Sequence, residues 1–226
     1  MSKVKFAVAL ILALTVGCAQ RKLPCIAKVY VEQVPVIHTA VILPIDDRGV
    51  VDQPIPRTVG MGHYERTKDS GAMLREVVKY EIENAAGLGV VDFEAIDKIL
   101  NGRVITPDEL TNVDGDEPIG IGLRVGADVV VAGRIRLCGE EDAPKSPRSY
   151  VVGELYVFES KSGRLIAGLD MNALDYPESC RHVAHKMCTR LCLKLRELKQ
   201  AALDRENQLQ HELHKKRNPL PHADRY

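Results

Sequence analysis

The chain has 226 residues, of which 45% are hydrophobic, which suffices for one folded core of ordinary size but not for two. Its 31 basic and 31 acidic residues balance, so no overall field attracts the protein to nucleic acid or to an anionic membrane. Aromatic residues make up only 4% and Trp is absent, which argues against a surface that stacks bases or sugars. We therefore expect no nucleic-acid partner.

The N-terminus resembles the export signal of a bacterial lipoprotein. Residues 1–5 are basic, and the apolar residues 6–17 are too few to span a bilayer as a mature helix. Small residues then precede Cys18, similar to a lipobox, although Thr15 stands where that pattern usually has leucine. We predict a signal peptide over residues 1–17 and a palmitate-type anchor on Cys18. The alternative is that Cys18 is an ordinary residue near the cleavage site of a secreted protein.

The anchor also predicts a location. Several acyl chains hold a protein on a membrane, whereas a single chain binds only reversibly. Ala19, rather than Asp, follows the cysteine, and in enterobacterial-type sorting this implies the periplasmic side of the cell outer membrane. Membrane lipid, bound through the acylated Cys18, is thus one expected partner. Residues 18–35 are expected to be the lipidated tether, in which residues 26–34 could pair as an edge strand.

The N-terminal half of the domain begins with a strand and a helix that are joined by a long loop. Residues 38–45 predict a strand, and the segment from Asp46 to Asp69 is rich in Pro and Gly. A loop of this length within a compact domain is usually functional or disordered, so it is the first candidate for a partner contact. Ser70 is expected to cap a helix over residues 71–86. The apolar stripe of this helix consists of Leu74, Val77, Val78, Ile82 and Ala85.

Three short segments follow. Residues 90–92 predict a strand, and residues 94–100 predict a helical turn that directs Ile96, Ile99 and Leu100 inward. A cap at Thr106, a proline at the first helical position and two early acids predict another short helix.

The run at residues 125–135 predicts a strand buried on both faces, because three consecutive valines lie between glycines. Residues 118–125 are expected to form the preceding helix, and Gly126 can take the left-handed conformation that ends it. Gly133 permits another element to approach closely. The polar residues 139–147 are expected to form a mobile loop.

The C-terminal part predicts a hairpin and one long helix. Strands at residues 149–158 and 164–174 flank a turn in which Gly163 suits a positive φ. Ser179 is expected to cap a helix over residues 180–214. Its heptad-like stripe consists of Ala184, Met187, Leu191, Leu195, Leu198 and Ala202. A helix longer than its domain suggests that it projects or packs on a neighbouring subunit.

Cysteine and histidine residues gather at the start of this helix. They are Cys180, His182, His185, Cys188 and Cys192. A zinc site needs four convergent ligands, but the cysteines share the apolar stripe, which favours core packing over metal or redox use. Among possible disulfides, Cys25 with Cys138 or with Cys180 stays open. We expect no metal and no cofactor.

Acidic residues offer no clear reaction centre either. Asp114 and Asp116 lie in a turn, but the full calcium-loop pattern is missing. Glu140, Glu141 and Asp142 are expected to be a solvated surface in a polar loop. The sequence also lacks the nucleophile-elbow, phosphate-loop and zinc-protease motifs, so we expect a protein that is not an enzyme.

The order of elements resembles the CsgG/TolB-N-like (LpoB/PelC-like) periplasmic domain of bacterial lipoproteins. The resemblance rests on the strand end at residues 41–44, on Val90-Val91-Asp92, on Gly126-Ala127-Asp128 with Gly133, and on the hairpin turn at residues 159–163. It implies an α/β (α+β) fold: a single three-layer-type domain with a mixed central sheet flanked by helices and a long C-terminal helix. Asp92-Phe93 replaces the family's Glu-Arg pair. Family members share a lipid anchor and a role in envelope assembly.

The resulting hypothesis is an outer-membrane lipoprotein that serves envelope biogenesis or export as an accessory component, with an envelope protein partner and a possible homo-oligomer. The alternative is a regulatory module that activates a periplasmic, peptidoglycan-type enzyme. The expected partner loop contains Asp46, Asp47, Arg48, Arg57, His63 and Tyr64. The expected divisions are the signal peptide at 1–17, the tether at 18–35, the domain at 36–204, and a polar, disordered tail at 205–226.

Overall fold

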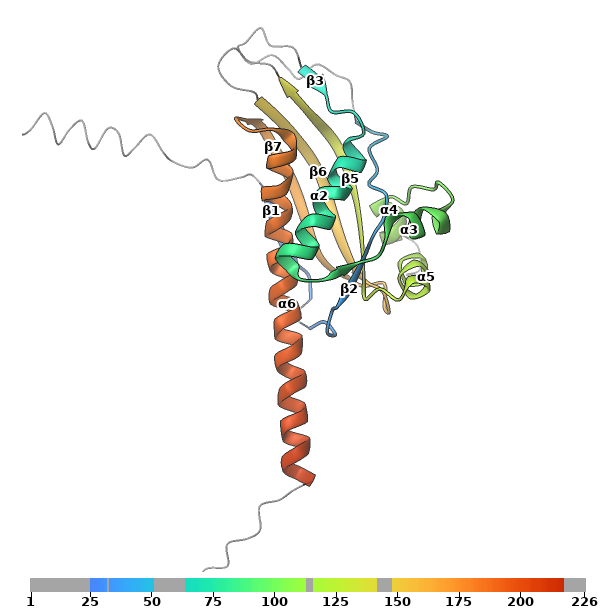
Figure 1. Cartoon of the computed structure of the whole chain (residues 1–226), viewed down its shortest axis with the longest axis vertical. Helices are drawn as coiled ribbons and strands as arrows, with labels where there is room; N and C mark the ends of the chain where they lie inside the picture. Colours follow the sequence, from blue (N-terminus) through green and yellow to red (C-terminus); the bar gives the residue numbers. More distant parts are fainter. Residues whose placement is uncertain (1–24, 32, 51–63, 113–115, 142–147, 218–226) are drawn as a thin grey trace, which may run out of the picture.

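The structure is a computed structural model, and it describes residues 25–31, 33–50, 64–112, 116–141 and 148–217 (Figure 1). The predicted signal peptide, Cys18, and the candidate loop residues Arg57 and His63 lie outside the described residues. Most of the expected Asp114–Asp116 turn also lies outside them.

The described strands form one mixed sheet of seven strands, in the order β1-β7-β6-β5-β2-β4, with β3 paired to β5. They are β1 (Cys25–Val29), β2 (Thr39–Ile42), β3 (Tyr64–Arg66), β4 (Gly89–Val90), β5 (Val129–Glu141), β6 (Arg148–Glu159) and β7 (Leu165–Tyr176). β2 runs parallel to both β4 and β5, whereas β5, β6, β7 and β1 pair antiparallel. The predicted mixed central sheet and the edge strand near the N-terminus are both confirmed.

Helices cover both faces of this sheet (Figure 1). They are α2 (Ser70–Glu81), the π-helical η2 (Ile82–Ala86), α3 (Phe93–Leu100), α4 (Pro107–Asn112), α5 (Asp116–Val125) and α6 (Cys180–Arg217). The α2 and α6 helices bury one core against the sheet, and α3, α4 and α5 bury a smaller one on the other face. The predicted α+β domain with a long C-terminal helix is confirmed. No helix within the described ranges combines the length and apolar character that crossing a membrane requires.

The larger core joins α6 to the sheet. Met187, Leu191 and Leu195 are almost fully buried, and they belong to the same core as Leu155 and Leu169 of the hairpin strands. This confirms the apolar stripe that the heptad-like spacing predicts. Burying a large aliphatic side chain contributes about 1.5–3 kcal/mol, so this stripe holds α6 to the domain.

Two expected boundaries were wrong. β5 continues to Glu141, because residues 139–141 pair with β6 on one side and with β3 on the other, and the rest of the expected loop lies outside the described residues. At the C-terminus, residues 205–217 continue α6 rather than forming a disordered tail. Ile99 was expected inside but is 37% exposed, since α3 turns only Ile96 and Leu100 into the core.

The two long helices begin differently. The Ser179 hydroxyl accepts a hydrogen bond of 3.3 Å from the backbone N–H of His182, which confirms the predicted cap of α6. Ser70, however, is the first residue of α2 rather than its cap. The Asp47 carboxylate takes over that role, because its Oδ2 accepts a hydrogen bond of 2.9 Å from the N–H of Gly71.

Gly133 confirms the expected close approach at the centre of the sheet. A Cβ there would clash with Leu155 Cδ2 and would lie 2.8 Å from the backbone oxygen of Glu154. Gly133→Ala should therefore destabilise the domain by about 1–3 kcal/mol, measured by chemical denaturation. Gly49→Ala is the matched control, since nothing lies within 4 Å of the added Cβ. Equal stabilities of the two variants would contradict this packing argument.

Candidate functional site: a charged cluster at the start of the long loop

The long loop leaves the sheet just after β2 and is fastened to β5 by its backbone. The N–H of Asp46 donates to the Gly133 oxygen at 3.0 Å, and the Asp46 oxygen accepts from the N–H of Ile135 at 2.8 Å. β2 is parallel to its neighbours, and the ends of parallel strands are where open α/β sheets usually bind ligands. The first residues of the predicted partner loop thus lie at a defined edge of the sheet.

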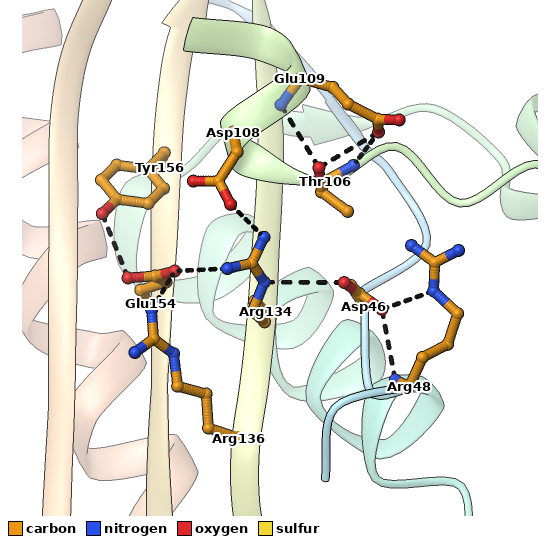
Figure 2. A network of polar contacts seen from close by, with 9 residues as sticks. All are labelled: Asp46, Arg48, Thr106, Asp108, Glu109, Arg134, Arg136, Glu154 and Tyr156. Atoms are coloured by element: carbon orange, nitrogen blue, oxygen red, sulfur yellow. Dashed lines mark hydrogen bonds and ion pairs between the residues drawn. The ribbon is translucent and has the colours of Figure 1, made fainter. Parts of the chain in front are cut away.

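Arg134 is the centre of a charged cluster at this edge (Figure 2). Its guanidinium contacts Asp108 Oδ2 of α4 at 2.6 Å, Asp46 Oδ2 at 3.6 Å and Glu154 Oε1 of β6 at 3.8 Å. These carboxylates, Asp108 first among them, raise the pKa of Arg134. One cation therefore ties together a loop, a helix and two strands.

Glu154 extends the cluster along β6. Its carboxylate also contacts Arg136 at 3.1 Å and accepts a hydrogen bond of 3.3 Å from the Tyr156 hydroxyl. Partial burial, aided by the charge of Glu154, raises the pKa of Tyr156 to about 12, so its phenol keeps its proton at neutral pH.

Asp46 is the buried member of the loop. Arg48 Nε donates to its Oδ1 at 2.8 Å, and this hydrogen bond lowers the pKa of Asp46. The Asp46 side chain is only 9% exposed, whereas that of Arg48 is 63% exposed. Asp46 therefore fixes the loop from inside while Arg48 faces solvent.

The α4 helix is held so that Asp108 can reach the cluster. The Thr106 hydroxyl accepts from the N–H of Glu109 at 3.3 Å, and Glu109 Oε2 accepts from the N–H of Thr106 at 2.7 Å. This reciprocal pair is a capping box, and it confirms the helix start predicted at Thr106.

The predicted loop residues have different roles in the structure. Asp46 and Arg48 join the cluster, whereas the Asp47 carboxylate is committed to the start of α2, where it also accepts from the Ser70 hydroxyl at 3.4 Å. Tyr64 is the first residue of β3 and pairs with Glu141, while the loop residues that precede it, 51–63, are outside the described ranges.

Sequence reasoning missed Arg134, Asp108 and Glu154. The sequence position of Arg134 could have indicated its role, because a charged residue directly after a buried, valine-rich strand must either pair with an opposite charge or face water. Asp108 was recognised only as an early acid of a helix. Nothing in the order of residues places Glu154 beside Arg134, since that pairing depends on the register of β5 against β6.

The cysteine and histidine residues of α6 do not converge on one point. Cys188 and Cys192 are buried in the larger core, where desolvation raises the pKa of Cys192 to about 12. His185 Nδ1 instead lies 2.9 Å from Glu81 Oε1 of α2, and the ring packs edge-on against Tyr80. Across the described residues, no grouping of His, Cys, Asp and Glu is suited to hold a metal ion.

The carboxylates of the cluster are paired with arginines. Asp46 pairs with Arg48, Asp108 with Arg134, and Glu154 with Arg136. Four of its charged side chains are well exposed: Arg48, Asp108, Glu109 and Arg136. The rim therefore presents both signs of charge to solvent.

Comparison with known proteins gives similarity of fold alone. No protein-family model matches the sequence, and no curated protein matches it. Among solved structures, the chain is similar to a PelC dodecamer from Paraburkholderia phytofirmans that carries one substitution, at 8% identity and a TM-score of 0.49, covering 77% of this chain and 98% of that one. A second similar structure is lipoprotein GNA1162 from Neisseria meningitidis, at 12% identity and a TM-score of 0.43, covering 70% and 97%.

A third is the LpoB C-terminal domain from Escherichia coli, at 12% identity and a TM-score of 0.34, covering 62% of this chain and 86% of that one. Similarity at this level decides nothing about the charged cluster or about activity. The resemblance to the CsgG/TolB-N family that the sequence pattern indicates stays a prediction.

The Asp46 interactions predict a pH dependence. The pKa of Asp46 is lower in the folded protein than in the unfolded chain, where it is about 4. Its charged form therefore contributes fully to folding stability above about pH 4, and this contribution is lost as the pH falls through the folded pKa. Asp46→Asn should lower the melting temperature at pH 7 by about 2–4 °C, and the difference should shrink as the pH falls below about 4.

The control is Asp170→Asn, which removes an exposed ion pair to Lys28 in which both side chains are 51% exposed. Such surface pairs contribute little, so this variant should melt like the parent protein. If Asp46→Asn lowers the melting temperature equally at pH 7 and at pH 3, the charge of Asp46 is not the cause.

Proposed function

We propose that this protein is an outer-membrane lipoprotein, anchored through Cys18 on the periplasmic side, that acts as a non-catalytic accessory component of envelope biogenesis or export. The observation that carries this proposal is the N-terminal sequence, in which a basic start, an apolar run and a Gly-Cys ending coincide within 18 residues. The family resemblance in the order of elements agrees with it.

The position of β1 supports an action close to the membrane. β1 begins at Cys25, seven residues after Cys18, so the predicted tether is shorter than residues 18–35. At about 3.3–3.6 Å per residue, that connection spans at most about 25 Å. A domain on so short a connection would meet partners that also lie at the bilayer surface.

The charged cluster supports a protein partner. Exposed Arg48, Arg136 and Asp108 surround the partly buried Arg134–Asp46 contact. Mixed charge on a rigid base favours a partner with a complementary polar surface, because such surfaces steer association and fix orientation. We assign this cluster as the contact surface for an envelope protein.

A homo-oligomer is the second part of the proposal, and α6 supports it. The helix projects beyond the rest of the domain (Figure 1). Leu209 and Leu213 lie on this part and are 61% and 57% exposed, after the buried stripe has ended at Ala202. Pairing of this part of α6 between copies would bury these leucines.

The anchor is tested by replacing the cysteine that would be lipidated. Cys18→Ser should abolish incorporation of labelled palmitate and move the protein from the membrane fraction to the soluble fraction, because the thioether cannot form. The matched control is Cys25→Ser, which leaves the predicted lipobox intact and should label and fractionate as the parent does. Unchanged labelling of Cys18→Ser would overturn the envelope assignment.

The contact surface is tested by charge reversal. Arg48→Glu with Arg136→Glu should reduce crosslinking to the envelope partner at least about tenfold, as an opposed charge costs more than a lost contact. Lys194→Glu is the control, since Lys194 is on α6 and is paired only with Glu197 among the residues described. Equal crosslinking by both variants would exclude the cluster as the contact.

A further inference from the structure

Two buried cysteines meet where α6 begins. Cys138 lies on β5 and Cys180 is the first residue of α6, and they are 0% and 2% exposed. The Cys180 thiol donates to the backbone oxygen of Gly139, the residue next to Cys138, at a distance of 2.9 Å. Both side chains belong to the larger core between α6 and the sheet.

The backbones that carry these thiols are held in place independently. The N–H of Cys180 donates to Glu140 Oε1 at 2.8 Å, so a side chain of β5 caps the start of α6. The backbone oxygen of Cys138 accepts from the N–H of Thr67 at 3.1 Å, where the long loop returns to the sheet. The sulfurs are thus brought together by the fold rather than by flexible side chains.

This pair differs from the other cysteines in reactivity. The neighbouring Cys138 thiol lowers the pKa of Cys180, which also lies at a helix N-terminus, where a thiolate is favoured. The same contact and burial raise the pKa of Cys138. Burial raises the pKa values of Cys188 and Cys192. These two cysteines lie one turn apart on the same helix, and this geometry does not suit a disulfide bond. The helix N-terminus is local to α6 and acts on Cys180 before α6 docks as well, so Cys180 is the attacking thiolate and Cys138 the second thiol.

We propose that Cys138 and Cys180 form an intramolecular disulfide when the chain folds in the presence of a disulfide oxidant, either a thiol–disulfide oxidoreductase or a small-molecule disulfide. The Cys180 thiolate attacks one sulfur of the oxidant and expels one thiolate, which leaves a mixed disulfide. The Cys138 thiol then gives up its proton, and its sulfur attacks Cys180 Sγ and expels the second thiolate. The cysteine pair loses two electrons and two protons, and the oxidant becomes two thiols.

The bond joins the end of β5 to the start of α6 across 42 positions of sequence. It thereby stabilises the docking of α6 and, through the Thr67 contact, the base of the long loop. Both sulfurs are buried, so the oxidant reaches them before α6 docks. The inference concerns two cysteines of the domain while the chain folds, and it does not depend on the proposed partner or anchor.

The test uses the full chain in detergent, refolded from denaturant with a mixture of oxidised and reduced glutathione. Free thiols are then alkylated and the peptides are mapped by mass. We expect one linked peptide pair that contains Cys138 and Cys180, with a loss of two hydrogens. Reduction should lower the melting temperature by about 5–15 °C, as expected for a loop of this length in a domain of this size.

Two variants distinguish loss of the disulfide from general destabilisation of the fold. Cys138→Ala and Cys180→Ala should each abolish the linked peptide and should melt near the reduced parent, whether reductant is present or absent. Cys192→Ala is the control, because it also alters a buried cysteine but should keep the linked peptide and the response to reductant. Alkylation of both Cys138 and Cys180 after refolding, or linkage of either one to Cys25, would overturn the proposal.

Discussion

Burial of β5 on both faces is the constraint on which the rest of the structure depends. Alternate side chains of this strand point to opposite sides, so Val129 and Val131 enter the core with α6 while Val130 enters the core with α3 and α5. The strand pairs in parallel with β2 and antiparallel with β6, and therefore joins the two halves of the sheet. Both helical layers need this strand before they can bury their apolar stripes.

The end of the same strand carries the polar chemistry of the domain. After Gly133, which has no room for a Cβ, β5 presents Arg134 to the start of the long loop and to α4. Farther along it presents Cys138 and Glu140 to the first residue of α6. A single strand thus changes from apolar to polar along its length, and the loop, the short helices and the long helix attach to its polar end. This arrangement gives the exposed charges around Arg134 a rigid base.

Much of the fold could be predicted because its signals are local. Three valines between glycines indicate a strand covered on both faces, and Gly126 and Gly163 take the positive φ values of 68° and 67° that such turns require. The spacing of the leucines in α6 indicates its buried stripe without knowledge of what covers it. The Thr106 capping box likewise involves residues three positions apart, so sequence alone reveals it.

The sequence by itself determined the α+β class, the order of the elements and the loop that begins at Asp46. Only the tertiary structure decided that Asp47 rather than Ser70 caps α2, that β5 continues through Glu141, and that Arg134 meets Asp46, Asp108 and Glu154. The reason is physical: periodicity and turn residues act over a few positions, whereas a carboxylate finds its partner only after strand register has fixed which distant residues are neighbours. The hydrogen bond from the Cys180 thiol to the backbone of Gly139, beside Cys138, likewise joins residues far apart in the sequence, and no local pattern predicts it.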